Sequence, residues 1–156
     1  MTEPATPTVD GVTIRRAVPA DAPAVADVFL AAFKATYEFP LAHTDEECRA
    51  WLAEEVVPLM ETWVAEVAAR VVAMMVLDEK GIGHLYVDPP SHGQGIGSRL
   101  VELAKRRRPE GLELYTFQVN KRARRFYEWH GFAVVTLGDG SGNEERQPDV
   151  LYRWRP

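Results

Sequence analysis

Apolar and polar residues follow two periods along the chain, one typical of strands and one typical of helices. Short or alternating apolar runs predict strands over residues 12–16, 62–67, 71–77, 82–87, 112–119, 132–137 and 150–154. Apolar residues at helical spacing predict helices that begin near Asp21, Thr44, Gly95 and Asn120. This order, strands first and then strands alternating with helices, indicates an α/β or α+β fold with a mixed sheet.

Local signals refine the first two helices. Asp21 is expected to cap the helix that follows it, and the aromatic connection over residues 36–42 separates that helix from the next. Thr44 and Glu47 have the spacing of a capping box, in which each side chain bonds the backbone N–H of the other residue. Pro58 is expected to end this second helix.

The stretch LYVDPPSHGQGIGSRL, residues 85–100, reads as a strand, a glycine-rich turn and the start of a helix. Free N–H groups and the positive end of the helix dipole favour an anion there, so we predict a phosphate-bearing ligand. A P-loop is excluded because Gly97, not Lys, precedes Ser98. The G-x-G-x-G spacing also departs from the dinucleotide-binding pattern. A glycine-rich turn without a ligand is the alternative.

A second block, LYTFQVNKRARRFYEWHGF, covers residues 114–132. Asn120 is placed to cap a helix whose apolar face includes Phe126 and Tyr127, and Gly131 is placed to end it. The two blocks together resemble the GNAT superfamily of acyl-CoA-dependent N-acetyltransferases, whose signatures are Q/R-x-x-G-x-G/A and N-x-x-A-x-x-F-Y-x-x-x-G-F. One departure is His92, which stands where the family has Gln or Arg and affects one side-chain contact.

The resemblance runs from residue 12 to residue 154 and implies a mixed, mostly antiparallel sheet of six to seven strands flanked by about four helices. It implies acetyl-CoA as co-substrate, with no metal. The backbone N–H of Val87 would polarise the thioester carbonyl, and Asn120 would contact the cofactor arm. The predicted cofactor-binding residues are Leu85, Tyr86, Val87, His92, Gly93, Gln94, Gly95, Ile96, Gly97, Ser98, Asn120, Phe126 and Tyr127.

Catalysis of acyl transfer needs a proton for the leaving thiolate and a base for the amine. Tyr127 is the predicted general acid, because a phenol with a pKa near ~10 matches a thiolate of similar basicity. The alternative is that Tyr127 only packs beside Phe126. Many relatives carry a Glu on the strand before the loop, and this strand has none. His84 on that strand, Glu38 in the aromatic connection and bulk water remain alternative bases.

Composition limits the classes of partner. The 156 residues suit one N-acetyltransferase domain over 12–156, preceded by a flexible tail over 1–11. Residues 1–80 carry a net charge of −8 and residues 81–156 carry +3, so the basic half holds the phosphate loop. The acidic half suits a cationic amine, and an acidic chain without a basic face disfavours nucleic acid. No apolar run reaches the ~20 residues of a membrane span, and the single Cys48 fits a reducing cytoplasm.

These observations predict an N-acetyltransferase that moves an acetyl group from acetyl-CoA to a primary amine by direct attack in a ternary complex. No covalent intermediate is expected, because Cys48 reads as a packing residue. The alternatives are a non-catalytic acyl-CoA-binding or sensing domain and a peptide or protein N-acetyltransferase. Acetyl-CoA and a small amine are the expected partners of a monomer or homodimer. The acidic loop over 138–149 either recruits an ammonium group or is a plain surface loop.

Overall fold

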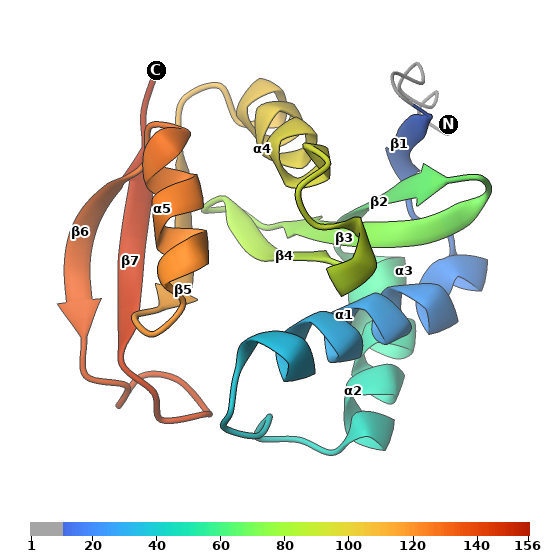
Figure 1. Ribbon diagram of the computed structural model, residues 1–156, viewed down its shortest axis with the longest axis horizontal. Coiled ribbons are helices and arrows are strands. Elements are labelled where there is room, and N and C mark those ends of the chain that lie inside the picture. Colours follow the sequence, from blue (N-terminus) through green and yellow to red (C-terminus); the bar gives the residue numbers. More distant parts are fainter. Residues whose placement is uncertain (1–10) are drawn as a thin grey trace.

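The computed structural model describes residues 11–156, in which the strands form two antiparallel sheets (Figure 1). The first sheet has the order β1-β2-β3-β4, from β1 (Val12–Arg16), β2 (Glu61–Val67), β3 (Arg70–Leu77) and β4 (Ile82–Val87). The second has the order β5-β7-β6, from β5 (Leu112–Phe117), β6 (Ala133–Gly138) and β7 (Asp149–Trp154). A parallel bridge between Gly81 and Glu113 links the two sheets where β4 and β5 begin.

The helices cover both sheets. They are η1 (Pro19–Asp21), α1 (Ala22–Thr36), the continuous run α2 (Asp45–Trp51), η2 (Leu52–Val56) and α3 (Val57–Leu59), then η3 (Pro89–Ser91), α4 (Ile96–Arg107) and α5 (Lys121–Trp129). Figure 1 shows α1 and α2 on one face of the first sheet, α4 on its other face and α5 against the second sheet. The predicted fold class is confirmed, with its seven strands divided between two sheets.

The apolar strand β3 holds the two layers together because both of its faces are buried. Ala73 and Met75 belong to the core between the first sheet and α4. Met74 and Val76 point the other way, into the core under α1 and the α2–α3 run. A strand covered by helices on both faces needs apolar side chains at successive positions, and the sequence of β3 supplies them.

The helix ends follow the predicted signals in part. The capping box is present: Glu47 N donates to Thr44 Oγ1 at 3.1 Å, and Thr44 N donates to Glu47 Oε1 at 2.8 Å. The helix continues one residue past Pro58, to Leu59. A π-helical turn precedes the proline, in which Val57 N donates to Leu52 O, and Pro58 itself has no N–H to donate. Asp21 does not cap α1, since its carboxylate instead accepts from Val18 N and pairs with Arg15.

Two further boundaries differ from the sequence prediction. β5 ends at Phe117 rather than at residue 119, because the chain turns there and Asn120 N donates to Phe117 O at 3.0 Å. Gln118 holds this turn against the second sheet, since its Nε2 donates to the carbonyl oxygens of Gly138 and Asp149, each at 3.0 Å. The expected tail over residues 1–11 lies, apart from Gly11, outside the described residues. Within residues 11–156, no helix combines the length and the apolar character needed to cross a bilayer.

Candidate active site

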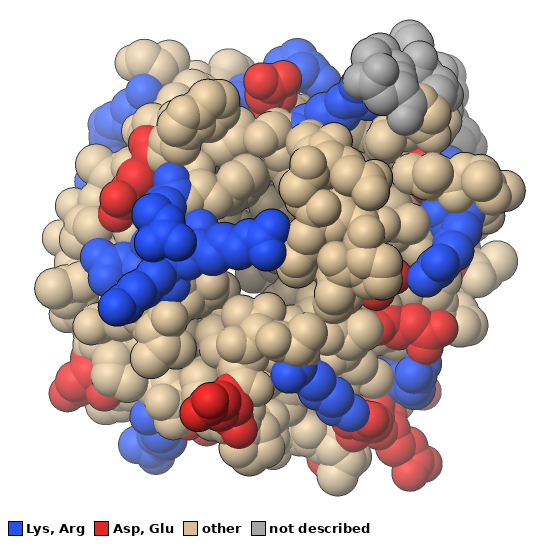
Figure 2. Space-filling model, in the orientation of Figure 1, with Lys and Arg blue, Asp and Glu red and all other residues tan. Residues whose placement is uncertain are grey.

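A cleft of about 1440 Å³ opens where β4 and β5 separate beyond the Gly81–Glu113 bridge. β4 is the outer strand of the first sheet and β5 is the outer strand of the second, so the cleft lies between the two sheets. The end of α1, the loop before α4, the start of α5 and the β6–β7 loop complete its walls. Figure 2 shows a hollow near the middle of the molecule, with Lys and Arg side chains gathered over α5 beside it.

The cleft brings together most of the residues predicted from the sequence. Those that line it are His84, Leu85, Tyr86, Val87, His92, Gly93, Gly95, Ile96, Gly97, Ser98, Asn120, Phe126 and Tyr127. Gln94 and Glu38 are exposed and lie outside the lining. Gln94 stands at the tip of the glycine loop, and Glu38 lies in the connection after α1, where its side chain faces solvent.

The glycine loop has the geometry of an anion site. Gly93 and Gly95 both have φ +79°, a left-handed conformation that favours glycine, and Gly95 forms the N-cap of α4. No side chain caps this helix, so its first N–H groups face the cleft. Gly97 is needed for a different reason: a Cβ there would lie 3.2 Å from Phe126 Cζ on α5. The loop and α5 therefore pack so closely that a larger residue requires a small shift.

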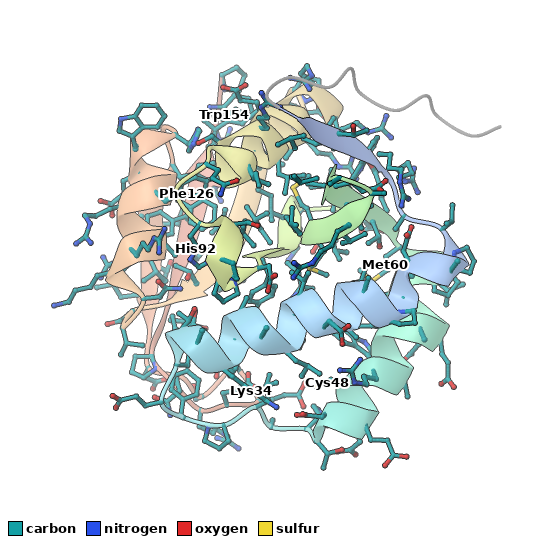
Figure 3. The ribbon with its side chains drawn as sticks, turned by 45° about the vertical axis from the view of Figure 1, so that its right-hand side comes forward. Lys34, Cys48, Met60, His92, Phe126 and Trp154 are labelled. Atoms are coloured by element: carbon teal, nitrogen blue, oxygen red, sulfur yellow. The ribbon has the colours of Figure 1, made fainter. Side chains whose placement is uncertain are left out.

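His92 links the two sides of the cleft opening (Figure 3). Its Nε2 lies 2.8 Å from the carbonyl oxygen of Val87, and its Nδ1 lies 3.1 Å from Arg122 Nη1. A carbonyl oxygen only accepts and a guanidinium only donates, so the neutral imidazole carries its proton on Nε2. The residue that departs from the family signature thus connects the end of β4 to the start of α5.

The free edge of β4 faces the cleft. Asp88 N donates to Val72 O on β3 at 2.8 Å, which fixes the edge to which that N–H points. Successive residues of a strand point their N–H groups to opposite edges, so Val87 N–H points away from β3 and toward the cleft. Pro89 follows in η3 and cannot extend the ladder. The strand end therefore presents a donor to a ligand.

Tyr127 combines a packed ring with an unpaired hydroxyl. The residue is 8% exposed, and its ring contacts those of Phe126 and Phe132 at centroid distances of 5.1 and 5.6 Å. Its hydroxyl forms no hydrogen bond with any residue from 11 to 156, although Tyr127 lines the cleft. Burial raises the pKa of this phenol, so it keeps its proton across the physiological range.

His84 lies among aromatic rings on the α1 side of β4. Its imidazole contacts Trp51, Phe29 and Tyr86 at centroid distances of 5.3, 6.0 and 6.3 Å. Desolvation by these rings lowers the pKa of His84 to about 4, against a smaller opposite effect of Asp78. The imidazole is therefore neutral at physiological pH and can accept a proton.

Asn120 forms the N-cap of α5, as predicted, with Ala123 N donating to its Oδ1 at 3.1 Å. The same amide donates from Nδ2 to the hydroxyl oxygen of Tyr37 at 2.8 Å. Tyr37 and Arg122 also line the cleft. The sequence around Tyr37 carries no local signal of its contact with Asn120, which lies 83 residues further along the chain.

The acidic β6–β7 loop forms polar contacts with the segment between α1 and α2. Ala42 N donates to Glu145 Oε2 at 3.0 Å, and His43 Nε2 lies 2.5 Å from Glu144 Oε2. These two glutamates are therefore engaged with the protein. Asp139 and Asp149 from the same region line the cleft instead.

Comparison with known proteins supports the assignment of class. A family described as an acetyltransferase (GNAT) domain matches residues 58–134. No curated protein sequence matches the chain significantly. The solution structure of apo YjaB from Escherichia coli superposes with a TM-score of 0.76 at 25% identity, covering 92% of this chain and 97% of that one.

Two further solved structures share the fold at lower identity. The PaiA N-acetyltransferase from Thermoplasma acidophilum, in complex with coenzyme A, has a TM-score of 0.70 at 19% identity and covers 93% of this chain and 99% of its own. The ribosomal-protein-S18-alanine N-acetyltransferase from Escherichia coli has a TM-score of 0.67 at 18% identity, covering 92% and 93%. The chain belongs to the GNAT superfamily. It is an acetyl-CoA-dependent acyltransferase.

Proposed function

We propose that the domain over residues 12–156 transfers the acetyl group of acetyl-CoA to a primary amine by direct attack within a ternary complex. The observation that carries this proposal is the Tyr127 hydroxyl. It has no hydrogen-bond partner among residues 11–156 and lines the same cleft as the glycine loop and the free edge of β4. A proton donor, an anion site and a backbone donor are the groups that acyl transfer from a thioester requires.

The cofactor side of the cleft would hold acetyl-CoA through backbone groups. The N–H groups of the loop from His92 to Ser98 suit the diphosphate, and the edge of β4 over Leu85–Val87 suits the polar arm. Lys121 and Arg122 line this part of the cleft and supply positive charge. Asn120 and Phe126 complete the predicted contacts from α5.

In the reaction we propose, the nitrogen lone pair of the amine attacks the thioester carbon. The carbonyl oxygen gains negative charge, and the N–H of Val87 is directed to stabilise it. The C–S bond then breaks, and the thiolate of coenzyme A takes the proton of Tyr127. The amine loses one proton during this sequence, and the tyrosinate regains one from solvent, so protons balance.

The base that receives the amine proton is His84 or water. A pKa of about 4 makes His84 fully available as an acceptor at neutral pH but weak as a base. We therefore propose that the ammonium form of the acceptor loses its proton to water before attack. His84 then accepts a hydrogen bond from the amine nitrogen. Glu38, exposed outside the lining, would act only by attracting a cation toward the cleft.

Release of coenzyme A, assayed with a panel of small amines and short peptides, tests the proposal. We expect turnover with small primary amines. Turnover confined to peptides would assign the protein to the peptide N-acetyltransferases. Tight binding of acetyl-CoA without release for any acceptor would overturn the proposed transfer and favour a sensing domain. The oligomeric state and the cytoplasmic setting stay predictions from the sequence.

A further inference from the structure

Besides the contacts of His92 with Arg122 and of Ala42 with Glu145, a hydrogen bond between Tyr37 and Asn120 joins the two halves of the molecule across the cleft. Tyr37, at the C-terminal end of α1, belongs to the half built on the first sheet, and Asn120, at the start of α5, belongs to the other half. Asn120 Nδ2 donates to Tyr37 Oη at 2.8 Å, over a separation of 83 residues. The Oδ1 of the same amide accepts from Ala123 N, so the amide is held at both ends.

Packed rings surround this bond. Tyr37 and Phe39 on one side each contact Phe117 of β5 on the other, both at a centroid distance of 5.2 Å. Tyr37 also contacts Phe33 of α1 at 4.7 Å and Phe39 at 4.9 Å. Rings at these separations are in direct contact and leave no gap between them. The four rings therefore form a wall that crosses from one half to the other, and the hydrogen bond fixes its position.

The wall stands next to the proposed reaction centre. Tyr37, Tyr86 and Tyr127 all line the same cleft. The phenol of Tyr37 is close enough to those of Tyr86 and Tyr127 to raise the pKa of each through charge interaction, in addition to the larger effect of burial. The Tyr37 side chain therefore borders the part of the cleft that holds the Tyr127 hydroxyl.

We propose that Tyr37 is a positioning and specificity-determining residue, which Asn120 holds so that the cleft keeps a fixed width beside the acyl group. This inference rests on the proposed function. A cleft of fixed width favours amines that are unbranched at the carbon bearing the nitrogen, because a methyl group there needs space beside the ring wall. Loss of the hydrogen bond frees the ring to move and admits the branched amine.

A double-mutant cycle separates this role from general packing. Tyr37→Phe removes the hydroxyl and keeps the ring, whereas Asn120→Ser keeps an N-cap oxygen for α5 and cannot reach Tyr37. Both single variants and the double variant are compared with the unaltered protein. Each amine that the unaltered protein acetylates is paired with its analogue methylated at the carbon next to nitrogen, and kcat and KM are measured for both.

We expect the unaltered protein to prefer the unbranched amine. Each single variant should reduce that preference about fivefold, the factor that a hydrogen bond of ordinary net strength supplies. The change should come from the KM of the amine, and Tyr37→Phe should alter kcat for the unbranched amine by less than about twofold, since the proton donor is untouched. Because Asn120 is also a predicted cofactor contact, Asn120→Ser is compared through the ratio of kcat/KM for the two amines at saturating acetyl-CoA. The double variant should lose no more preference than either single variant. Tyr152→Phe is the matched control, because it also removes a hydrogen-bonded hydroxyl and Tyr152 lies outside the cleft lining.

An unchanged preference in active variants would overturn this inference and leave the proposed function intact. Additive losses in the double variant, or an equal loss in Tyr152→Phe, would also overturn it, because the effect would not depend on the bond between Tyr37 and Asn120. Absence of turnover with every amine in the unaltered protein would overturn the proposed function and this inference together. Denaturant unfolding of each variant shows whether a loss arises from the fold.

Discussion

At the scale of the residue, the proposed reaction depends on the phenol of Tyr127, whose ring is packed and whose hydroxyl is the proton donor. The ring is held by Phe126 and Phe132, so replacing Tyr127 with Phe keeps the packing and removes only the proton donor. We expect Tyr127→Phe to lower kcat by about 10² to 10⁴, the usual contribution of general acid catalysis. Calorimetry should give an unchanged Kd for acetyl-CoA, since the contacts of the loop remain.

The control for this substitution is Tyr152→Phe, which removes a hydroxyl that bonds Glu128 outside the cleft lining. Its kcat should match that of the unaltered protein. If Tyr127→Phe turns over as fast as the unaltered protein at saturating substrate, Tyr127 has no part in proton transfer and the phenol is a packing residue.

His84 should link stability to pH. Its pKa is about 4 in the folded protein against an ordinary 6.5, so the folded state binds fewer protons than the unfolded state between these values. The contribution of His84 to the free energy of unfolding is complete above pH 6.5. It decreases as the pH falls toward 4, by at most about 3 kcal/mol. We expect His84→Gln to be less stable near pH 7 and to lose less stability on acidification than the unaltered protein.

Denaturant unfolding at several pH values measures this difference. The comparison must be between the two proteins, because burial lowers the pKa of His130 as well and gives a slope of the same sign. Parallel stability curves for the two proteins between pH 6.5 and 4 would show that the pKa of His84 is not lowered by folding.

At the scale of the element, the turn from β4 into α4 requires glycine at two positions for different reasons. Gly95→Ala places a side chain on a backbone at φ +79°, which costs roughly 1–2 kcal/mol. Gly97→Ala pushes a methyl group to 3.2 Å from Phe126 Cζ, so the Phe126 ring or the start of α4 must shift by a few tenths of an ångström. Both substitutions should weaken acetyl-CoA binding about tenfold or more, since each displaces the N–H groups of the loop.

Gly11→Ala provides the matched control for these two variants. Gly11 also has a positive φ, of +78°, but it lies outside the cleft lining, and a Cβ there would meet no atom within 4 Å. Its Kd for acetyl-CoA, measured by calorimetry, should stay that of the unaltered protein. Equal affinities in all three variants would mean that acetyl-CoA does not use the glycine loop.

Elements set by local sequence were predictable, and elements set by distant partners were not. The Thr44 capping box, the Gly95 turn and the Asn120 cap each depend on residues within a few positions. By contrast, β5 ends at Phe117 in a turn that Gln118 holds through carbonyl partners at positions 138 and 149. No periodicity within residues 112–119 carries that information, so the sequence prediction extended the strand.

The same reasoning explains the candidate site. Most cleft residues lie in two contiguous blocks whose motifs are local, so they could be named in advance. The contacts of His92 with Arg122 and of Tyr37 with Asn120 join residues 30 and 83 positions apart. They exist only because the two sheets bring β4, α1 and α5 to the same cleft, which is a property of the tertiary fold.

At the scale of the whole molecule, the charges that line the cleft are divided between elements. Lys121 and Arg122 line it at the start of α5, and Arg122 contacts His92 of the glycine loop. Asp139 and Asp149 line it at the β6–β7 loop. Residues 1–80 carry a net charge of −8. A polyphosphate and a cationic amine would each find a group of opposite charge in the cleft lining.

This division predicts that the acceptor is an amine that is cationic in solution. Because attack requires the free base, kcat/KM should rise with pH toward an apparent pKa between neutrality and that of the amine. His84, neutral well below pH 7, adds no inflection in this range. Asp139→Asn should raise KM for the amine by at most about tenfold with little change in kcat, since an exposed charge is screened by solvent and attracts the cation only weakly.

Glu38→Gln is the comparison for Asp139→Asn, because both substitutions remove one exposed carboxylate and only Asp139 lines the cleft. A rise in KM with Asp139→Asn and a smaller rise with Glu38→Gln would place the cation at the β6–β7 loop. A fall in kcat with Glu38→Gln would instead make Glu38 the base. Added salt should raise KM for the amine in the unaltered protein and less so in Asp139→Asn. Preference for neutral or anionic acceptors, or a salt effect equal in both proteins, would contradict the prediction, because attraction by Asp139 is its stated cause.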